Sequence, residues 1–170
     1  MNVRLDLKIQ EKPLKITLTI LRFIMAVEFL WAFFDKLLGL GFATKPEGAW
    51  IRGGSPTFGF LAKGSTGPFA GIFQAIGGKG IIDWLFMLAL LLIGVALALG
   101  IGMKIATISG SVLMFLMWAA SLPKPNNLFQ IDDHIINIFV LLVLLFAKAG
   151  QYAGLGNKWA VLVKKVQWLE

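Results

Sequence analysis

Three consecutive titratable residues, Asp132, Asp133 and His134, stand directly before the apolar run IINIFVLLVLLF. Aspartates at the start of a helix accept its free N–H groups and complement its dipole, so capping explains one or both acids. Capping does not explain the histidine, because a cation is unfavourable at that end of a helix. Asn137 follows at a spacing that reaches both Asp133 and His134 on a helix. The pattern predicts a polar site at the start of the run, with capping as the alternative.

A second titratable pair lies in the apolar stretch LRFIMAVEFLWAFFDKLLGLG. Glu28 and Asp35 are seven residues apart, so on a helix they share a face within about 20°. If the stretch spans a membrane, a carboxylate in its middle needs an interior, a cavity or a partner charge. We therefore expect Glu28 to face the protein interior and to handle protons, and a buried structural carboxyl is the alternative. We expect Arg22 to snorkel to the cytoplasmic side, with a role in lipid or subunit binding as the alternative.

A third candidate is the glycine-rich segment RGGSPTFGFLAKGSTGP, residues 52–68. Glycines let backbone N–H groups turn toward an anion. Arg52 and Lys63 add positive charge, and the hydroxyls of Ser55 and Thr57 can donate hydrogen bonds. The segment predicts an anion site, with an ordinary external loop as the alternative. We expect this segment to meet the other polar residues that stand at the same end of the apolar stretches: Asp35, Lys36, Asp83, Asp132, Asp133 and His134.

The composition indicates which elements position these residues. Of 170 residues, 58% are hydrophobic and 15% charged, and the mean hydropathy is +0.80. A soluble domain has roughly 25% charged residues, so the chain is predicted to be an integral membrane protein. Without cysteine it has no disulfide, thiolate or iron–sulfur chemistry of its own. Its single histidine excludes a haem held by two histidines, and we expect no metal site.

Four apolar stretches are long enough to span a bilayer. We expect one all-α membrane domain over residues 1–170, an antiparallel four-helix bundle with spans at about 14–38, 81–100, 104–122 and 132–149. Small residues four apart, such as Gly94 with Ala98 and Ala106 with Gly110, predict a close approach of the second and third spans. The connection 39–79 is a long glycine-rich loop, and PFAGIFQAIG within it is predicted to form an interfacial or re-entrant helix.

Basic residues predict the orientation, because cytoplasmic flanks are enriched in lysine and arginine. Nine of them fall on the side of both termini: Arg4, Lys8, Lys12, Lys15, Lys104, Lys148, Lys158, Lys164 and Lys165. Six fall on the other side: Lys36, Lys45, Arg52, Lys63, Lys79 and Lys124. We therefore expect a multi-pass protein of the cell membrane with both termini in the cytoplasm. The basic residues form no stripe with interleaved aromatics, so nucleic acid is not an expected partner.

Four segments resemble the DoxX/DoxD family of small four-helix membrane proteins: LRFIMAVEFLWAFFDKLLGLG, GGSPTFGFL, DWLFMLALLLIGVALALGIGMKIA and DDHIINIFVLLVLLFAKAGQYAGLG. The resemblance covers residues 21–156. The combination of DWLFM with LGIGMKIA looks closer to the DoxD branch, which is a subunit of archaeal thiosulfate:quinone oxidoreductase.

The resemblance implies oxidation of thiosulfate to tetrathionate on the outer face, with electrons passed to membrane quinone. It also implies a DoxA-like second subunit and association with a terminal quinol oxidase. We assign the proton chemistry to Glu28, Asp35, Asp83, Asp132, Asp133 and His134. We assign thiosulfate binding to Lys36, Arg52, Gly53, Gly54, Ser55, Thr57 and Lys63. We assign the quinone slot to Trp31, Trp84 and Trp118, because quinone needs an apolar site with aromatics.

Two other classes remain open. One is a non-catalytic assembly subunit of a respiratory quinol oxidase complex, which needs the helix surfaces but not the polar site. The other is a transporter or proton channel, which needs a polar path through the membrane. The cytoplasmic halves of the last three spans carry no acid and no histidine, which disfavours such a path.

Overall fold

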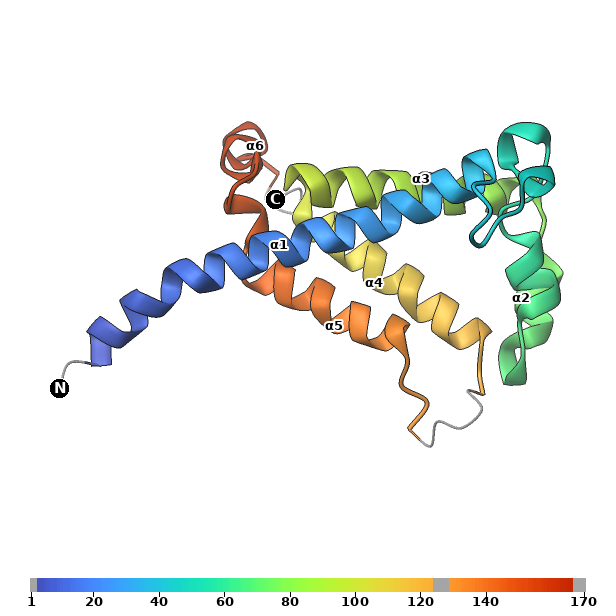
Figure 1. Cartoon of the computed structure of the whole chain (residues 1–170), viewed down its shortest axis with the longest axis horizontal. Helices are drawn as coiled ribbons and strands as arrows, with labels where there is room; N and C mark the ends of the chain where they lie inside the picture. Colours follow the sequence, from blue (N-terminus) through green and yellow to red (C-terminus); the bar gives the residue numbers. More distant parts are fainter. Residues whose placement is uncertain (1–2, 124–128, 167–170) are drawn as a thin grey trace.

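The chain is all-α, as expected from the sequence (Figure 1). The computed structural model describes residues 3–123 and 129–166, with side chains from Glu11 onward. Within these ranges the only pairing of β type is an isolated bridge between Thr66 and Ser121. The α-helices are α1 (Val3–Leu38), α2 (Ala70–Ile76), α3 (Gly80–Leu99), α4 (Met103–Ala120), α5 (Asp133–Phe146) and α6 (Gly156–Leu162).

Three helices are long and apolar enough to cross a membrane. They are Glu11–Leu38 within α1, with 28 residues, α3 with 20 and α4 with 18. At about 1.5 Å per residue they are about 42, 30 and 27 Å long, against the ~30 Å thickness of the hydrocarbon layer. The chain is therefore compatible with a multi-pass membrane protein. Of the basic residues used to predict orientation, Arg4, Lys8 and Lys124 lie outside the described side chains.

The fourth predicted span is shorter than expected. We predicted it at 132–149, but α5 covers the 14 residues Asp133–Phe146. Asp132 is its N-cap, and the side chain accepts a hydrogen bond from the backbone N–H of Ile135. The helix stops because Lys148 takes a left-handed conformation, with φ 51°. The chain then enters a short 3-10 turn, Ala149–Gln151.

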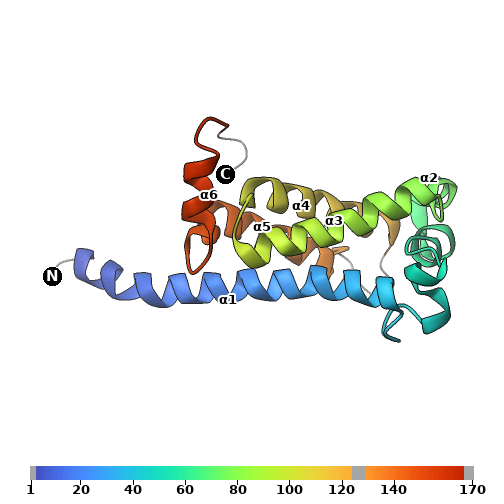
Figure 2. The same cartoon turned by 90° about the horizontal axis from the view of Figure 1, so that it is seen from above.

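The helices pack in sequence order around one apolar core. The most extensive contacts join α1 to α3 and α4 to α5, and α3 packs on α4. Figures 1 and 2 both show α1 alongside α3. The core between them holds large side chains that are fully or almost fully buried: Met25, Phe29, Met87, Leu97, Leu141 and Leu144.

The small residues of α3 and α4 make room for side chains of α1 and α5. A Cβ on Gly94 would lie 2.7 Å from the Leu30 side chain of α1. A Cβ on Gly110 would lie 3.0 Å from the Leu141 side chain of α5. The glycine in each helix therefore admits a leucine from α1 or α5. A Cβ on Gly110 would also lie 3.5 Å from the Ile93 side chain of α3, and α3 packs on α4, so the small residues are not reserved for one helix pair.

The connection from α1 to α3 is built of short helical turns. They are Pro46–Gly48, Trp50–Arg52, Phe58–Gly64 and Gly67–Phe69, followed by α2. The helical character predicted for PFAGIFQAIG is thus confirmed. α2 lies at one end of the molecule, across the direction of α3 (Figure 1). Phe73 of α2 packs in a small apolar cluster with Ala119 and Ala120 at the end of α4, so the connection is folded against the helices.

Arg22 is completely buried, and the prediction that it snorkels is wrong. Its Nη1 donates to the carbonyl oxygen of Leu97 and, at 2.9 Å, to that of Ala98. Its Nη2 donates to the carbonyl oxygens of Tyr152 and Ala153, at 3.4 and 3.2 Å. The last carbonyls of a helix have no partner within it. The guanidinium supplies that partner at the end of α3 and ties the segment after α5 to the same point.

We expect Arg22→Met to lower the free energy of unfolding by about 2 kcal/mol or more, because it leaves buried carbonyls without a donor. Thermal unfolding of the protein in detergent measures this effect. Arg52→Met is the matched control. Arg52 is exposed and makes one long bond, 3.4 Å to the carbonyl oxygen of Pro46, so its loss should change stability by less than about 0.5 kcal/mol. Equal effects of the two substitutions would contradict this role of Arg22.

Candidate functional site

Five polar side chains meet where the start of α5 faces α1, and we call them the acid–histidine cluster: Glu28, Asp132, Asp133, His134 and Asn137. The imidazole Nδ1 of His134 lies 2.9 Å from Oδ2 of Asp132 and 3.4 Å from Oδ1 of Asp133. The side chains of His134 and Asp132 are 17% and 16% exposed, whereas Asp133 is 81% exposed. The predicted site at the start of the run therefore contains a mostly buried histidine–aspartate pair as well as a helix cap.

Glu28 joins this cluster from α1. The side-chain amide of Asn137 donates to Oε1 of Glu28 at 2.6 Å. The Glu28 carboxyl is also close enough to Asp133 and His134 for their charges to interact. The expectation that Glu28 faces the protein interior is wrong, since its side chain is exposed on the flank of α1. It nevertheless has the polar partner that an acid in an apolar helix requires.

The contact between Glu28 and Asn137 fixes the depth of the cluster along the helices. Glu28 is ten residues before the end of α1, about 15 Å along the helix. Asn137 is four residues after Asp133, about 6 Å. Since α1 and α5 run in opposite directions (Figure 1), Asp133 lies about 9 Å short of the end of α1. Asp35 itself lies seven residues after Glu28, about 10.5 Å, so the depths of Asp35 and Asp133 differ by only about 4–5 Å, less than one helical turn.

An apolar groove of about 380 Å³ runs along the seam between α1 and α5. Leu21 lines it from α1, two helical turns before Glu28. Its other walls are Ile131, Ile135, Ile136, Phe139, Val140 and Val143. Ile135 directly follows His134, and Val140 is one turn after Asn137. The groove therefore adjoins the acid–histidine cluster.

The arrangement is suited to proton transfer beside an apolar molecule. A carboxylate bonded to one imidazole nitrogen orients the ring and fixes which nitrogen faces away from it. Asp132 does this at Nδ1, and among the described residues Nε2 has no hydrogen-bond partner. Glu28 is a second proton-carrying group, held by Asn137. Two acids and a histidine can thus give or take protons at the edge of the groove.

The same residues could also hold a cation. One ligand atom from each of Asp132, Asp133 and His134 lies within 4.8 Å of the other two. We predicted no metal site from the sequence, and this grouping of possible ligand atoms was not foreseen. The contacts of the imidazole Nδ1 with the two carboxylates account for this closeness, so the grouping does not by itself indicate a metal.

Asp83 has a different environment from the one predicted. Its Oδ1 accepts hydrogen bonds from the Ser55 hydroxyl at 2.9 Å, the Thr57 hydroxyl at 2.5 Å and the Thr57 backbone N–H at 3.1 Å. Asp83 and Thr57 are both buried. The donors predicted for an external anion thus bind a carboxylate of the chain itself, which fixes the glycine-rich segment to the start of α3.

The adjacent glycines are explained by the turn they make. Gly53 has φ 86°, a conformation that favours glycine. A Cβ on Gly54 would lie 2.1 Å from the carbonyl oxygen of Gly48. Close packing of the segment, with no ligand required, is sufficient reason for both residues.

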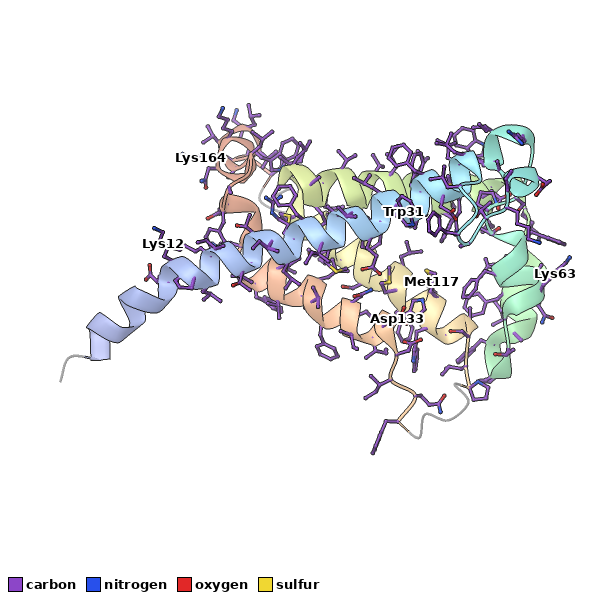
Figure 3. The ribbon with its side chains drawn as sticks, in the orientation of Figure 1. Lys12, Trp31, Lys63, Met117, Asp133 and Lys164 are labelled. Atoms are coloured by element: carbon purple, nitrogen blue, oxygen red, sulfur yellow. The ribbon has the colours of Figure 1, made fainter. Side chains whose placement is uncertain are left out.

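Asp35 and the loop cations also have separate partners. The carboxylate of Asp35 is buried and accepts the backbone N–H groups of Phe42 and Ala43, at 3.2 and 3.1 Å. Lys36 Nζ lies 5.9 Å from the centre of the Phe86 ring, and Lys63 Nζ lies 5.0 Å from that of Phe58. Figure 3 shows Asp133 well apart from Lys63. Among the described residues, no hydrogen bond or ion pair joins Asp35 or Asp83 to the acid–histidine cluster, so the single predicted site divides into separate parts.

The three tryptophans assigned to a quinone slot contact three different groups. Trp31 packs edge-to-face on Phe42, with ring centres 4.8 Å apart, and Trp84 does so on Trp50 at 4.6 Å. Trp118 donates from Nε1 to the carbonyl oxygen of Gln130 at 2.7 Å. None of them lines the groove beside the cluster, whose aromatic residue is Phe139. The sequence feature that could have predicted the groove is the apolar face of residues 131–143, next to His134.

Comparisons with models of known families, with characterised proteins and with solved structures find no match to this chain. Function is therefore inferred from its own residues and geometry.

The Glu28–Asn137 contact can be tested by a double-mutant cycle with Glu28→Ala, Asn137→Ala and the pair. We expect a coupling energy of about 0.5–1.5 kcal/mol, the size found for hydrogen bonds between membrane helices. Unfolding in mixed micelles measures it. A cycle between Glu47 and Asn137 is the control, because Glu47 lies in an exposed turn of the long connection. Coupling no larger than in the control would contradict the contact.

Proposed function

We propose that the chain is the membrane subunit of a thiosulfate:quinone oxidoreductase of the DoxX/DoxD type. In this proposal α1, α3, α4 and α5 form an antiparallel four-helix membrane bundle with both termini in the cytoplasm. The groove between α1 and α5 receives the ring of a membrane quinone. The observation that carries the proposal is the acid–histidine cluster, whose neighbours in the chain, Ile131 and Ile135, line this apolar groove. The substrate class comes from the resemblance of four sequence segments to that family.

The proposed reaction balances with groups that the site provides. Two thiosulfate dianions lose two electrons and join through a new sulfur–sulfur bond to form tetrathionate. The quinone takes up the two electrons and two protons to become a quinol. His134, oriented by Asp132, and Glu28 deliver the protons at the edge of the groove. The chain offers no cysteine, so electrons pass directly to quinone or through the DoxA-like partner.

Thiosulfate recognition is assigned to the outer end of the molecule. The cations there, including Lys36, Arg52 and Lys63, would lower the repulsion between two dianions. The hydroxyls of Ser55 and Thr57 already bind Asp83. In the refined proposal these two residues shape the loop, and the lysine and arginine side chains with the partner subunit contact the substrate.

We expect His134→Ala to lower thiosulfate-dependent quinone reduction by about 100-fold or more, the usual contribution of a general acid. Glu28→Gln keeps the shape of the side chain and should also impair turnover while assembly stays intact. Glu47→Gln, in an exposed turn, is the control and should leave the rate unchanged. Quinol and tetrathionate are measured in membranes that hold the chain with and without its partner subunit.

The groove has its own test in the same assay. Phe139→Ala should raise the KM for quinone, because Phe139 lines the groove, while Phe115→Ala on the exposed side of α4 should not. Quinone reduction that is insensitive to both His134→Ala and Phe139→Ala would place the reaction elsewhere. No thiosulfate-dependent reduction in the complete complex would reject the proposed function.

A non-catalytic assembly subunit of a respiratory quinol oxidase is the alternative. The observation that favours it is that Arg22, Asp35 and Asp83 are all buried and bind groups of this chain. Much of the polar chemistry of the sequence is thus structural. This alternative predicts that the chain co-purifies with oxidase subunits and that His134→Ala changes neither assembly nor activity.

The proposed orientation predicts that the long connection is outside the cell. The chain has no cysteine, so Glu47→Cys in an exposed turn gives a single labelling site. An impermeant thiol reagent should label it in intact cells, and Lys158→Cys in α6 should be labelled only after lysis. The reverse pattern would invert the orientation, and equal labelling of both would reject a fixed one.

A further inference from the structure

A second cavity lies at the other end of the molecule from the long connection. It measures about 340 Å³ and is enclosed by the start of α4, the end of α5 and α6. Its apolar walls are Met103, Leu145, Phe146 and Trp159, and glycine backbones of the α3–α4 turn and of the segment after α5 complete it. None of the proposed chemistry uses this cavity.

Two lysines line the cavity from different elements. Lys104 stands in the first turn of α4, and Lys148 follows the last turn of α5. Both are exposed, and neither has an ion pair in the described part of the chain. Gln151 adds a polar side chain to the lining. The cavity therefore combines two unneutralised cations with a mainly apolar wall, which is the chemistry of an anionic headgroup joined to a hydrocarbon chain.

The direction of α6 indicates where this end lies relative to a bilayer. Figure 1 shows α6 end-on, and Figure 2 shows it standing across the direction of α1. A helix perpendicular to the spanning helices lies in the plane of the membrane surface. Val161 and Leu162 are 74% and 78% exposed, while Lys158 on the same helix and Lys165 just after it are exposed cations.

Further cations gather at this end. Figure 3 shows Lys12 of α1 and Lys164 on the same side of the molecule, away from Lys63. Exposed apolar residues between lysines suit an interface where hydrocarbon meets phosphate. The cavity thus opens beside an element with the pattern of an interfacial anchor.

We propose that this cavity binds one anionic phospholipid. Its phosphate lies between Lys104 and Lys148, and an acyl chain follows Leu145 and Phe146 along the end of α5. The bound lipid connects α4, α5 and α6, and so holds the C-terminal segment to the membrane face of the protein. The proposal does not depend on the activity at the acid–histidine cluster.

Native mass spectrometry of the full chain in neutral detergent tests the site. Phosphatidylglycerol should bind one-to-one and more tightly than phosphatidylcholine with the same acyl chains. Lys104→Gln with Lys148→Gln should lower the affinity for phosphatidylglycerol by on the order of 10-fold or more. Each lysine near an anionic lipid contributes appreciably to the binding free energy. The pair Lys104→Arg with Lys148→Arg should keep the binding and shows that the fold tolerates change at both positions.

The control pair is Lys45→Gln with Lys63→Gln, two exposed lysines of the long connection that give the same change in net charge. It should leave the affinity unchanged. Equal weakening by the control pair would mean general surface attraction and would overturn the site. Equal binding of phosphatidylcholine would mean an apolar groove without headgroup recognition. Inorganic phosphate that binds as tightly as the lipid would mean a free-anion site, and either result would reject the proposal.

Discussion

One buried guanidinium joins the first long helix to the end of α3 and to the segment after α5. Arg22 of α1 donates to the carbonyls of Leu97 and Ala98, at the end of α3, and of Tyr152 and Ala153, after α5. Burying a charge in an apolar environment is costly unless its hydrogen-bonding groups are satisfied. The carbonyls at the end of a helix carry partial negative charge and have no partner of their own. The two Nη groups and the four carbonyls thus satisfy each other, while Nε of Arg22 is buried without a partner in the described part of the chain. The end of α3 is fixed next to the segment that leads to α6.

The same rule accounts for the other buried charges. Asp35 closes the turn after α1 through two backbone N–H groups, and Asp83 fixes the glycine-rich segment through Ser55 and Thr57. These acids are used to hold backbone in place at one end of the molecule. The acid–histidine cluster differs, because its members bond largely to each other and adjoin an apolar groove. This difference is why we place the proton chemistry there and not at Asp35 or Asp83.

The sequence predicted the positions of the helices better than the contacts that their polar side chains make. Apolar length was sufficient to locate α1, α3 and α4, because a span is a property of a continuous segment. The early end of α5 depends on a positive φ at Lys148, for which lysine gives no signal. The partners of Arg22 are backbone carbonyls distant in sequence, and carbonyls have no residue-type signature. Spacing paired Glu28 with Asp35 on one helix, whereas packing of α5 against α1 gave it Asn137 instead.

The shortness of α5 has a consequence for the surrounding lipid. Its 14 residues cover about 21 Å, roughly two-thirds of an average hydrocarbon thickness. In the proposed four-helix membrane bundle, this hydrophobic mismatch would be relieved by local thinning of the bilayer or by headgroups and water that descend toward the short helix. The leaflet beside α5 would then be dimpled above Asp132 and His134. In that geometry the protein brings the aqueous phase down to its polar residues by deforming the membrane, without a pore through the helices.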